Sequence, residues 1–231
     1  SFFQQLYNTV DTIIVGRAVG TSALAAVGST GNLTNLIINF YVGLSTGASV
    51  VIAQYYGAQN NKKIHQAVHT SYSLAIVSGI LMMLFGLFFS YQCLDAIGTP
   101  HDILNDATLY MQLYFLCMIP GAIYNIGAGI LRAVGDSKRP LYYLIVCSIV
   151  NVVFDFIFVV IFHQGIAGAA IATVIAQSVC AILVTIQLMR TNEVYKLTLS
   201  KMKFHLPVLK KIIMIGAPAG IQSTMYSISN I

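Results

Sequence analysis

Charged side chains are scarce in this sequence of 231 residues. Asp, Glu, Lys and Arg together make up 8% of the chain, whereas hydrophobic residues make up 57%. Soluble domains usually carry about 25% charged residues. So small a share excludes an ordinary soluble domain, and the composition predicts an integral membrane protein.

The sequence also lacks the signals of several functional classes. Its net charge is +5, but the basic residues lie in short loops and not in a patch with interleaved aromatic residues, so no nucleic-acid partner is expected. No catalytic constellation is present, so we expect neither enzymatic activity nor a cofactor. The chain begins without Met, inside an apolar stretch, with no basic leader and no cleavage site. The start looks truncated, and no signal peptide is expected.

Cysteine and histidine show no metal-binding pattern. The four cysteines are scattered without CxxC or Cys/His spacing, so we interpret them as apolar filling of helices. The five histidines lie at the ends of apolar segments or in loops, and we expect them to be solvated or interfacial. These residues are Cys93, Cys117, Cys147, Cys180, His65, His69, His101, His163 and His205.

Long apolar segments recur along the chain, separated by short stretches that contain Gly, Pro or charged residues. Each is long enough to cross a hydrocarbon layer of about 30 Å as a helix, so the sequence predicts an all-α polytopic membrane protein. We interpret residues 1–190 as a six-helix transmembrane lobe, 191–207 as a cytoplasmic linker and 208–231 as the truncated seventh helix that starts a second lobe. The six complete segments cover residues 1–19, 30–53, 66–91, 106–131, 140–162 and 165–189.

The distribution of basic residues predicts the orientation. If the first connection lies outside, eleven of the twelve Lys and Arg residues fall in cytoplasmic loops, and Arg17 alone lies outside. This is a strong positive-inside bias. We therefore expect a multi-pass protein of the plasma membrane, in contact with membrane lipid, whose amino end is cytoplasmic.

Two carboxylates, Asp11 and Asp155, lie inside segments that are otherwise apolar. An acid within a membrane helix is costly unless it faces a partner or a water-filled cavity. Asn151 precedes Asp155 by one helical turn, so both side chains share a helix face. These residues predict a cation or proton site, although hydrogen bonding between helices is an alternative role for Asn151 and Asp155.

Thr173 adds a third helix to this site. Counted from the ends of their segments, Asp11, Asp155 and Thr173 lie at about the same depth, roughly 10–12 Å below the outer surface. Three oxygen-bearing side chains from three helices at one level are what a hard cation or a proton requires. We therefore predict that Asp11, Asn151, Asp155 and Thr173 form one site.

A second set of polar and adaptable side chains is a candidate for contact with substrate. Three asparagines are spaced i, i+3 and i+7 on one helix face, where they line either a helix contact or an aqueous cavity. A Tyr and a Met suit apolar cations through cation–π and thioether contacts, although ordinary packing is the simpler explanation for each. A Gln extends the face of Thr173. The six residues are Asn32, Asn35, Asn39, Tyr114, Met118 and Gln177.

Five motifs run along the chain in a specific order and spacing. They are YNTVDTIIVG at 7–16, AQYYGA at 53–58, RAVGDS at 132–137, NVVFD at 151–155 and GIAGAAIAT at 165–173. Each motif is weak by itself. Together they resemble the multidrug and toxic compound extrusion (MATE) family of cation-coupled antiporters.

The resemblance implies twelve helices in two bundles around a central cavity, with this chain as the first bundle, the linker and the start of the second. It also implies efflux of bulky, often cationic organic compounds in exchange for Na+ or H+, by a protein expected to be monomeric when full length. The family's cation site maps onto Asp11, Asn151, Asp155 and Thr173. A weak internal repeat places Asn230 opposite Asp11, so that the acid would belong to the first half only.

Three alternative functions make different demands on the sequence. A lipid-linked oligosaccharide flippase of related architecture should carry cationic residues in its cavity to meet a pyrophosphate, and no Lys or Arg lies in the middle of a segment. A membrane-embedded metal-dependent enzyme would need His or further acids near the acidic pair. A passive channel would need a re-entrant filter segment. Neither of these last two patterns is found, so antiport is the favoured interpretation.

Overall fold

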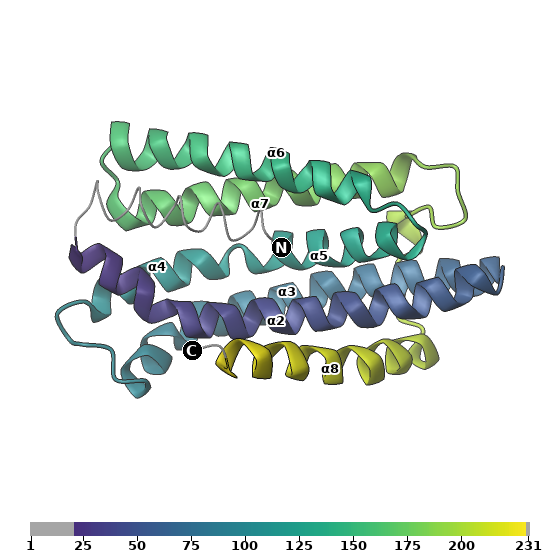
Figure 1. Ribbon diagram of the computed structural model, residues 1–231, viewed down its shortest axis with the longest axis horizontal. Helices are drawn as coiled ribbons and strands as arrows, with labels where there is room; N and C mark the ends of the chain where they lie inside the picture. Colours follow the sequence, from purple (N-terminus) through teal and green to yellow (C-terminus); the bar gives the residue numbers. More distant parts are fainter. Residues whose placement is uncertain (1–20, 230–231) are drawn as a thin grey trace. The chain divides into compact units, whose positions relative to one another are not determined.

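The computed structural model of this chain describes residues 21–229, and every element in that part is a helix (Figure 1). The expected all-α fold is confirmed for these residues. Residues 1–20, which contain Asp11, lie outside the described part. The elements are α2 (Thr21–Gly57), α3 (Asn61–Ala96), α4 (Leu104–Phe115), α5 (Met118–Ala133), α6 (Lys138–Asp155), the π-helix η1 (Phe156–Ile161), α7 (Gly165–Arg190), the 3-10 turn η2 (Leu199–Lys201) and α8 (Leu206–Ser229).

Within the described residues, four helical stretches are long and apolar enough to cross a membrane. They are Leu36–Gly57, Asn61–Ala96, Lys138–Ile161, which joins α6 to η1, and Gly165–Arg190. The bent pair α4 and α5 makes a fifth when counted as one span. Large apolar side chains on these helices are exposed, as with Phe88 of α3 at 70%. Such exposure is expected where the outer face of a helix contacts lipid tails, which are as apolar as the side chains themselves.

The segment 106–131, expected as one span, is divided into α4 and α5. The N–H groups of Leu116 and Cys117 donate to the carbonyls three residues earlier, at 3.1 Å and 2.9 Å, and close α4. Pro120 explains the break, because it has no N–H for the carbonyl of Leu116 and its ring clashes with that carbonyl in a continuous helix.

The described residues divide into two compact units, and several helices contribute to both. Unit 1 holds the residues of the predicted cation site on α6 and α7. Unit 2 holds the start of α3, the connection between α7 and α8, and α8 itself. Unit 1 comprises the described residues up to Asn32, Ile80–Pro120 and Tyr142–Cys180; unit 2 comprises Leu33–Gly79, Gly121–Leu141 and the described residues from Ala181 onward.

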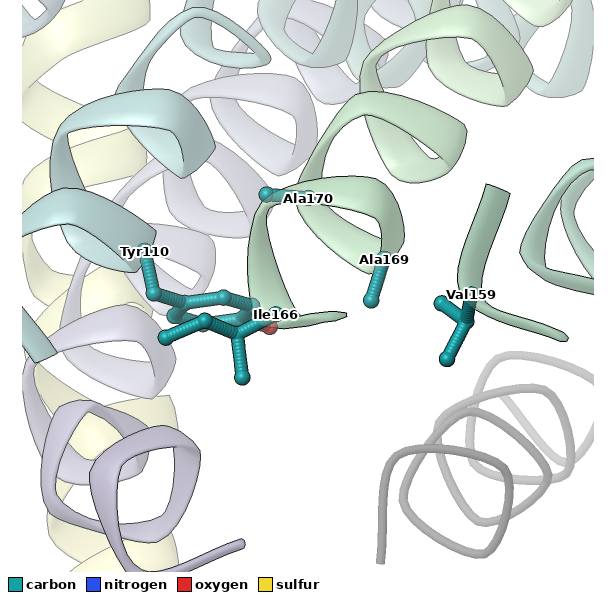
Figure 2. Close-up of a cluster of buried hydrophobic side chains, with 5 residues drawn as sticks. All are labelled: Tyr110, Val159, Ile166, Ala169 and Ala170. Carbon is teal, nitrogen blue, oxygen red and sulfur yellow. The ribbon is translucent and has the colours of Figure 1, made fainter. Parts of the chain in front are cut away.

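Unit 1 has a buried apolar cluster where η1 and α4 meet the first turns of α7. The cluster contains Val159 of η1, Tyr110 of α4, and Ile166, Ala169 and Ala170 of α7. Figure 2 shows the Tyr110 ring next to Ile166, and Val159 on the side of Ala169. The two alanines leave room for these neighbours, because small side chains let membrane helices approach closely.

A tight connection fixes η1 against the start of α7. The N–H of Phe162 donates to the carbonyl of Ile157, and the N–H of Gln164 to the carbonyl of Phe158, both at 2.9 Å. A Cβ atom at Gly168 would lie 3.0 Å from the Cβ of Phe158, so α7 and η1 are closely packed at this contact. The position of the segment that follows Asp155 is therefore set by backbone bonds and by packing.

In unit 2, α2 and α8 contact each other at glycine residues on both helices. Gly43 and Gly47 on α2, and Gly216 and Gly220 on α8, form two GxxxG patterns. A Cβ at Gly43 would lie 2.5 Å from the Cα of Gly220, and a Cβ at Gly47 would lie 2.3 Å from the carbonyl oxygen of Ile212. The two backbones therefore touch, as they do in close GxxxG crossings of membrane helices.

We predict that Gly47→Ala destabilises the chain. The added methyl group overlaps the carbonyl of Ile212, so the helices must separate, and overpacking of this kind lowers the free energy of unfolding by about 1–3 kcal/mol. Thermal unfolding of the purified chain in detergent measures the change. Gly121→Ala on α5 is the matched control, because no atom lies within 4 Å of its Cβ position, and equal stability of the two variants would contradict the prediction.

Candidate cation site

Asp155 is the last residue of α6, and its side chain is fully buried at 0% exposure. From Pro140 to Phe154 the helix carries no other charged residue. A carboxylate in such surroundings loses its hydration, and the loss is costly unless another group or an ion replaces the water. The side chain of Asp155 is therefore buried, as its position within an apolar segment predicts.

Asn151 and Thr173 are brought together across α6 and α7. Asn151 is 1% exposed and Thr173 4%. The amide nitrogen Nδ2 of Asn151 donates to the Thr173 hydroxyl at 3.4 Å, and that hydroxyl donates to the carbonyl of Ala169 at 3.1 Å. Because the single hydroxyl proton is directed to Ala169, Thr173 acts as an acceptor toward Asn151.

The direction of these bonds leaves the oxygen of Asn151 available. Its Oδ1 atom is buried and has no hydrogen-bond partner among the described residues. A buried acceptor without a donor is costly, and a cation removes that cost when it accepts the lone pairs. Asp155 lies one turn further along the same face of α6. The site thus offers a carboxylate, an amide oxygen and a hydroxyl oxygen, the ligand type that hard cations prefer.

The donor set does not favour a transition metal. Within residues 21–229, no group of three or more His, Cys, Asp or Glu side chains could hold a metal ion. Carboxylate, carbonyl and hydroxyl oxygens suit hard cations, whereas imidazole and thiolate select zinc, copper and iron. The oxygens of Asn151, Asp155 and Thr173 are of the kind that hard cations prefer.

A π-helical turn follows Asp155 directly. The six residues Phe156–Ile161 form η1, and the backbone changes from α to π hydrogen bonding at the acid. Turns of this kind inside α-helices are rare and occur often at functional sites. No signal in the sequence predicts this turn, because six apolar residues are compatible with either type of helix.

The candidate substrate residues are spread over both units. The Tyr114 ring lies 6.1 Å from that of Tyr110 and packs against the apolar cluster, and Met118 is 4% exposed. Gln177 lies one turn beyond Thr173, and its buried Oε1 atom has no hydrogen-bond partner in the described part of the chain. Asn39 is half-buried in unit 2. Asn32 and Asn35 lie in α2, and their side chains, like all of Asp11, are outside the described part.

Unit 2 contains an apolar cavity that the sequence did not reveal. Its volume is about 550 Å³, and helices α2, α3 and α8 line it. Of the candidate substrate residues whose side chains the structure describes, which are Asn39, Tyr114, Met118 and Gln177, none is among its walls. Its lining includes Leu36, Phe40, Leu74, Ile213, Gly216 and Ile221.

The sequence matches known transporters over almost its full length. The family model MatE matches residues 1–157. The chain is 30% identical over 237 aligned positions to "Probable multidrug resistance protein YoeA" of Bacillus subtilis, covering 99% of this chain and 51% of the relative. It is 23% identical to "Probable multidrug resistance protein NorM" of Thermotoga maritima, covering 97% and 49%. The chain thus spans about half the length of the curated relatives it matches.

Solved structures agree with this result. A crystal structure described as MATE in the bent conformation has a TM-score of 0.91 and 27% identity, covering 98% of this chain and 50% of that one. An inward-facing conformation of a multidrug resistance MATE family transporter of the MOP superfamily has a TM-score of 0.90 and 28% identity, covering 97% and 51%.

We predict that Thr173→Val lowers stability more than Thr173→Ser. Valine removes the acceptor and leaves a buried N–H of Asn151 unpaired, which costs about 1–3 kcal/mol, whereas serine keeps the hydroxyl. Thermal unfolding of both purified variants tests this. A valine variant as stable as the serine variant would show that the hydrogen bond between Asn151 and Thr173 does not contribute to stability.

Proposed function

Because this chain belongs to the MatE family of multidrug efflux transporters, we propose that it carries the ion-coupling site of a secondary active exporter. The transporter would move bulky, often cationic organic compounds out of the cell in exchange for Na+ or H+. The observation that carries this proposal is the fully buried Asp155 beside an amide oxygen of Asn151 that has no partner among the described residues.

The physical basis of ion capture is the cost of a buried charge. A carboxylate without water is stabilised when a proton neutralises it or when Na+ replaces its hydration. Asn151 and Thr173 supply neutral oxygens beside it, and their hydrogen bonds hold those oxygens in fixed directions. Asp11 would complete the site, in keeping with the resemblance noted from the sequence.

Coupling requires that the ion-bound and ion-free forms favour different conformations, because a ligand shifts an equilibrium only by its difference in affinity for the two states. The backbone next to Asp155 offers a place where such a difference can act. There α6 passes into η1, and η1 contacts α7 through Val159 and Phe158. Neutralising Asp155 would therefore change the charge at a junction that is packed against α7.

The apolar cavity of unit 2 supports bulky, carbon-rich substrates. Ligand sites are mostly apolar and have volumes of about 300–1,000 Å³, and this cavity of about 550 Å³ falls in that range. Several curated relatives carry multidrug names. A flippase for lipid-linked oligosaccharides is less well supported, because its anionic headgroup would need cationic residues in the cavity wall, and among the residues that the structure describes no Lys or Arg lines the cavity.

The remaining expectations complete the proposal. We place the protein in the plasma membrane with its amino end in the cytoplasm, in agreement with the positive-inside bias. The chain would act as the first lobe of a twelve-helix monomer, since it covers about half of its relatives. No cofactor other than the coupling ion is proposed, and no catalytic role.

We predict that Asp155→Asn abolishes ion-driven efflux but not membrane insertion. A neutral amide cannot take up a proton or attract Na+ through charge, while loss of a buried charge helps insertion. Efflux from proteoliposomes of a transporter that contains this chain, with Na+ and H+ gradients imposed separately, measures the effect. The exposed Asp102→Asn is the control, and lost expression of Asp155→Asn in place of lost coupling would favour a structural role.

We also predict that the two halves are unequal. The repeat places Asn230 opposite Asp11, and an amide does not titrate at physiological pH. Asn230→Ala should therefore leave the Na+ or pH dependence of efflux largely intact, whereas Asp11→Asn removes it, when both variants are compared at equal surface abundance. Equal loss in the two variants would mean that the cation path crosses both lobes.

A further inference from the structure

The connection between α7 and α8 is fixed to α3. We call residues 198–206 the strap. The N–H of Thr198 donates to Nε2 of His69 at 3.1 Å, and the N–H of His205 donates to the Thr70 hydroxyl at 3.1 Å. That hydroxyl donates to the carbonyl of Lys203 at 3.4 Å. The strap is therefore held at both of its ends.

His69 is suited to this role by its tautomer and its burial. Its Nδ1 lies 2.7 Å from the carbonyl of His65, to which only a protonated Nδ1 can donate, so that Nε2 is left as the acceptor for Thr198. Both His69 and Thr70 are 0% exposed. The expectation that all five histidines are solvated or interfacial is therefore wrong for His69.

The outer side of the strap combines apolar and cationic side chains. Leu206 is 73% exposed, Leu199 49% and Phe204 43%. Lys201 and Lys203 are exposed between them. Because the backbone is tied to α3, these side chains stay on the outside. Apolar groups held outward next to lysines are typical of segments that lie in a membrane interface.

Four more lysines belong to the same unit, at the ends of the neighbouring helices. Lys62 and Lys63 begin α3, and Lys210 and Lys211 lie in the first turns of α8. The ammonium groups of Lys63 and Lys211 both lie over the ring of Tyr55, 5.5 Å and 5.4 Å from its centroid. The first turns of α3 and α8 thus bring positive charges to Tyr55, near the end of α2.

Carboxylates do not neutralise these charges. The only ion pair found among the described residues joins Arg139 and Asp136, and from residue 191 to 211 the sole acid is Glu193. A row of lysines without counter-ions attracts an anionic surface. The segment joins the ends of two helices, α7 and α8, and therefore lies at the level where lipid headgroups are found.

We propose that the strap and its flanking lysines bind anionic phospholipid headgroups, with Leu199, Phe204 and Leu206 inserted among the upper acyl chains. Clusters of four to eight basic residues beside a membrane helix have this preference, and the exposed apolar residues distinguish the surface from one that binds nucleic acid or an acidic protein. The inference rests on membrane insertion alone and is independent of the transported substrate and of the coupling ion.

The chain contains no Trp, so Phe204→Trp places a single tryptophan, whose emission can be excited selectively, in the strap. The variant is reconstituted into vesicles of phosphatidylcholine and phosphatidylglycerol, with bromine on the acyl chains of one lipid or of the other. We expect brominated phosphatidylglycerol to quench the Trp more strongly at equal mole fraction, by about twofold or more, and the excess to fall as salt is added. No quenching, or equal quenching by the two lipids, would overturn the proposal.

Two controls separate a specific surface from general positive charge. Lys201→Gln with Lys203→Gln should weaken the preference for phosphatidylglycerol, whereas Lys138→Gln with Arg139→Gln removes the same charge elsewhere and should preserve it. Phe88→Trp, at an exposed site of α3, should be quenched equally by both lipids and confirms insertion. If both charge-pair variants lose the preference to the same extent, net charge and not the strap attracts the lipid, and the proposal fails.

Discussion

A carboxylate enclosed by apolar helices must be solvated by something other than water, and Asp155 places that demand on the surrounding structure. One helical turn before it on the same face, Asn151 donates to Thr173, and Thr173 donates to Ala169. Each step sends a proton away from Asn151 Oδ1 and keeps its lone pairs available. The buried acceptor that results is an oxygen, the ligand type that hard cations prefer.

Much of this site could be predicted because membrane helices obey simple rules. An acid in an apolar run is conspicuous, so the sequence singles out Asp155, and the i, i+4 spacing places Asn151 on the same helix face. Thr173 was selected by depth, since helices rise by a constant amount per residue, and the structure places its hydroxyl 3.4 Å from Asn151. The π-helical turn Phe156–Ile161 could not be predicted, because its residues are equally apolar in either type of helix.

The break between α4 and α5 and the burial of His69 do not follow from the apolar composition of their segments. Pro120 divides α4 from α5, although the apolar run 106–131 is long enough for one span. The position of His69 near a helix end predicts a solvated or interfacial side chain, yet His69 is buried and accepts a hydrogen bond from Thr198, more than a hundred residues later in the chain. Contacts at such sequence separation depend on tertiary packing, about which local patterns carry no information.

Main-chain atoms make the close contact between α2 and α8, so substitutions affect this interface differently from one made of side chains. Most interfaces are weakened by trimming a side chain and are mapped by doing so. Gly43, Gly47 and Gly216 have no side chain to remove, and a Cβ added at any of the three would lie 2.8 Å or less from a backbone atom of the other helix. An alanine substitution at these positions would therefore lower stability by adding atoms and not by removing a favourable contact. Substitutions can only increase the volume at this interface, and none can reduce it.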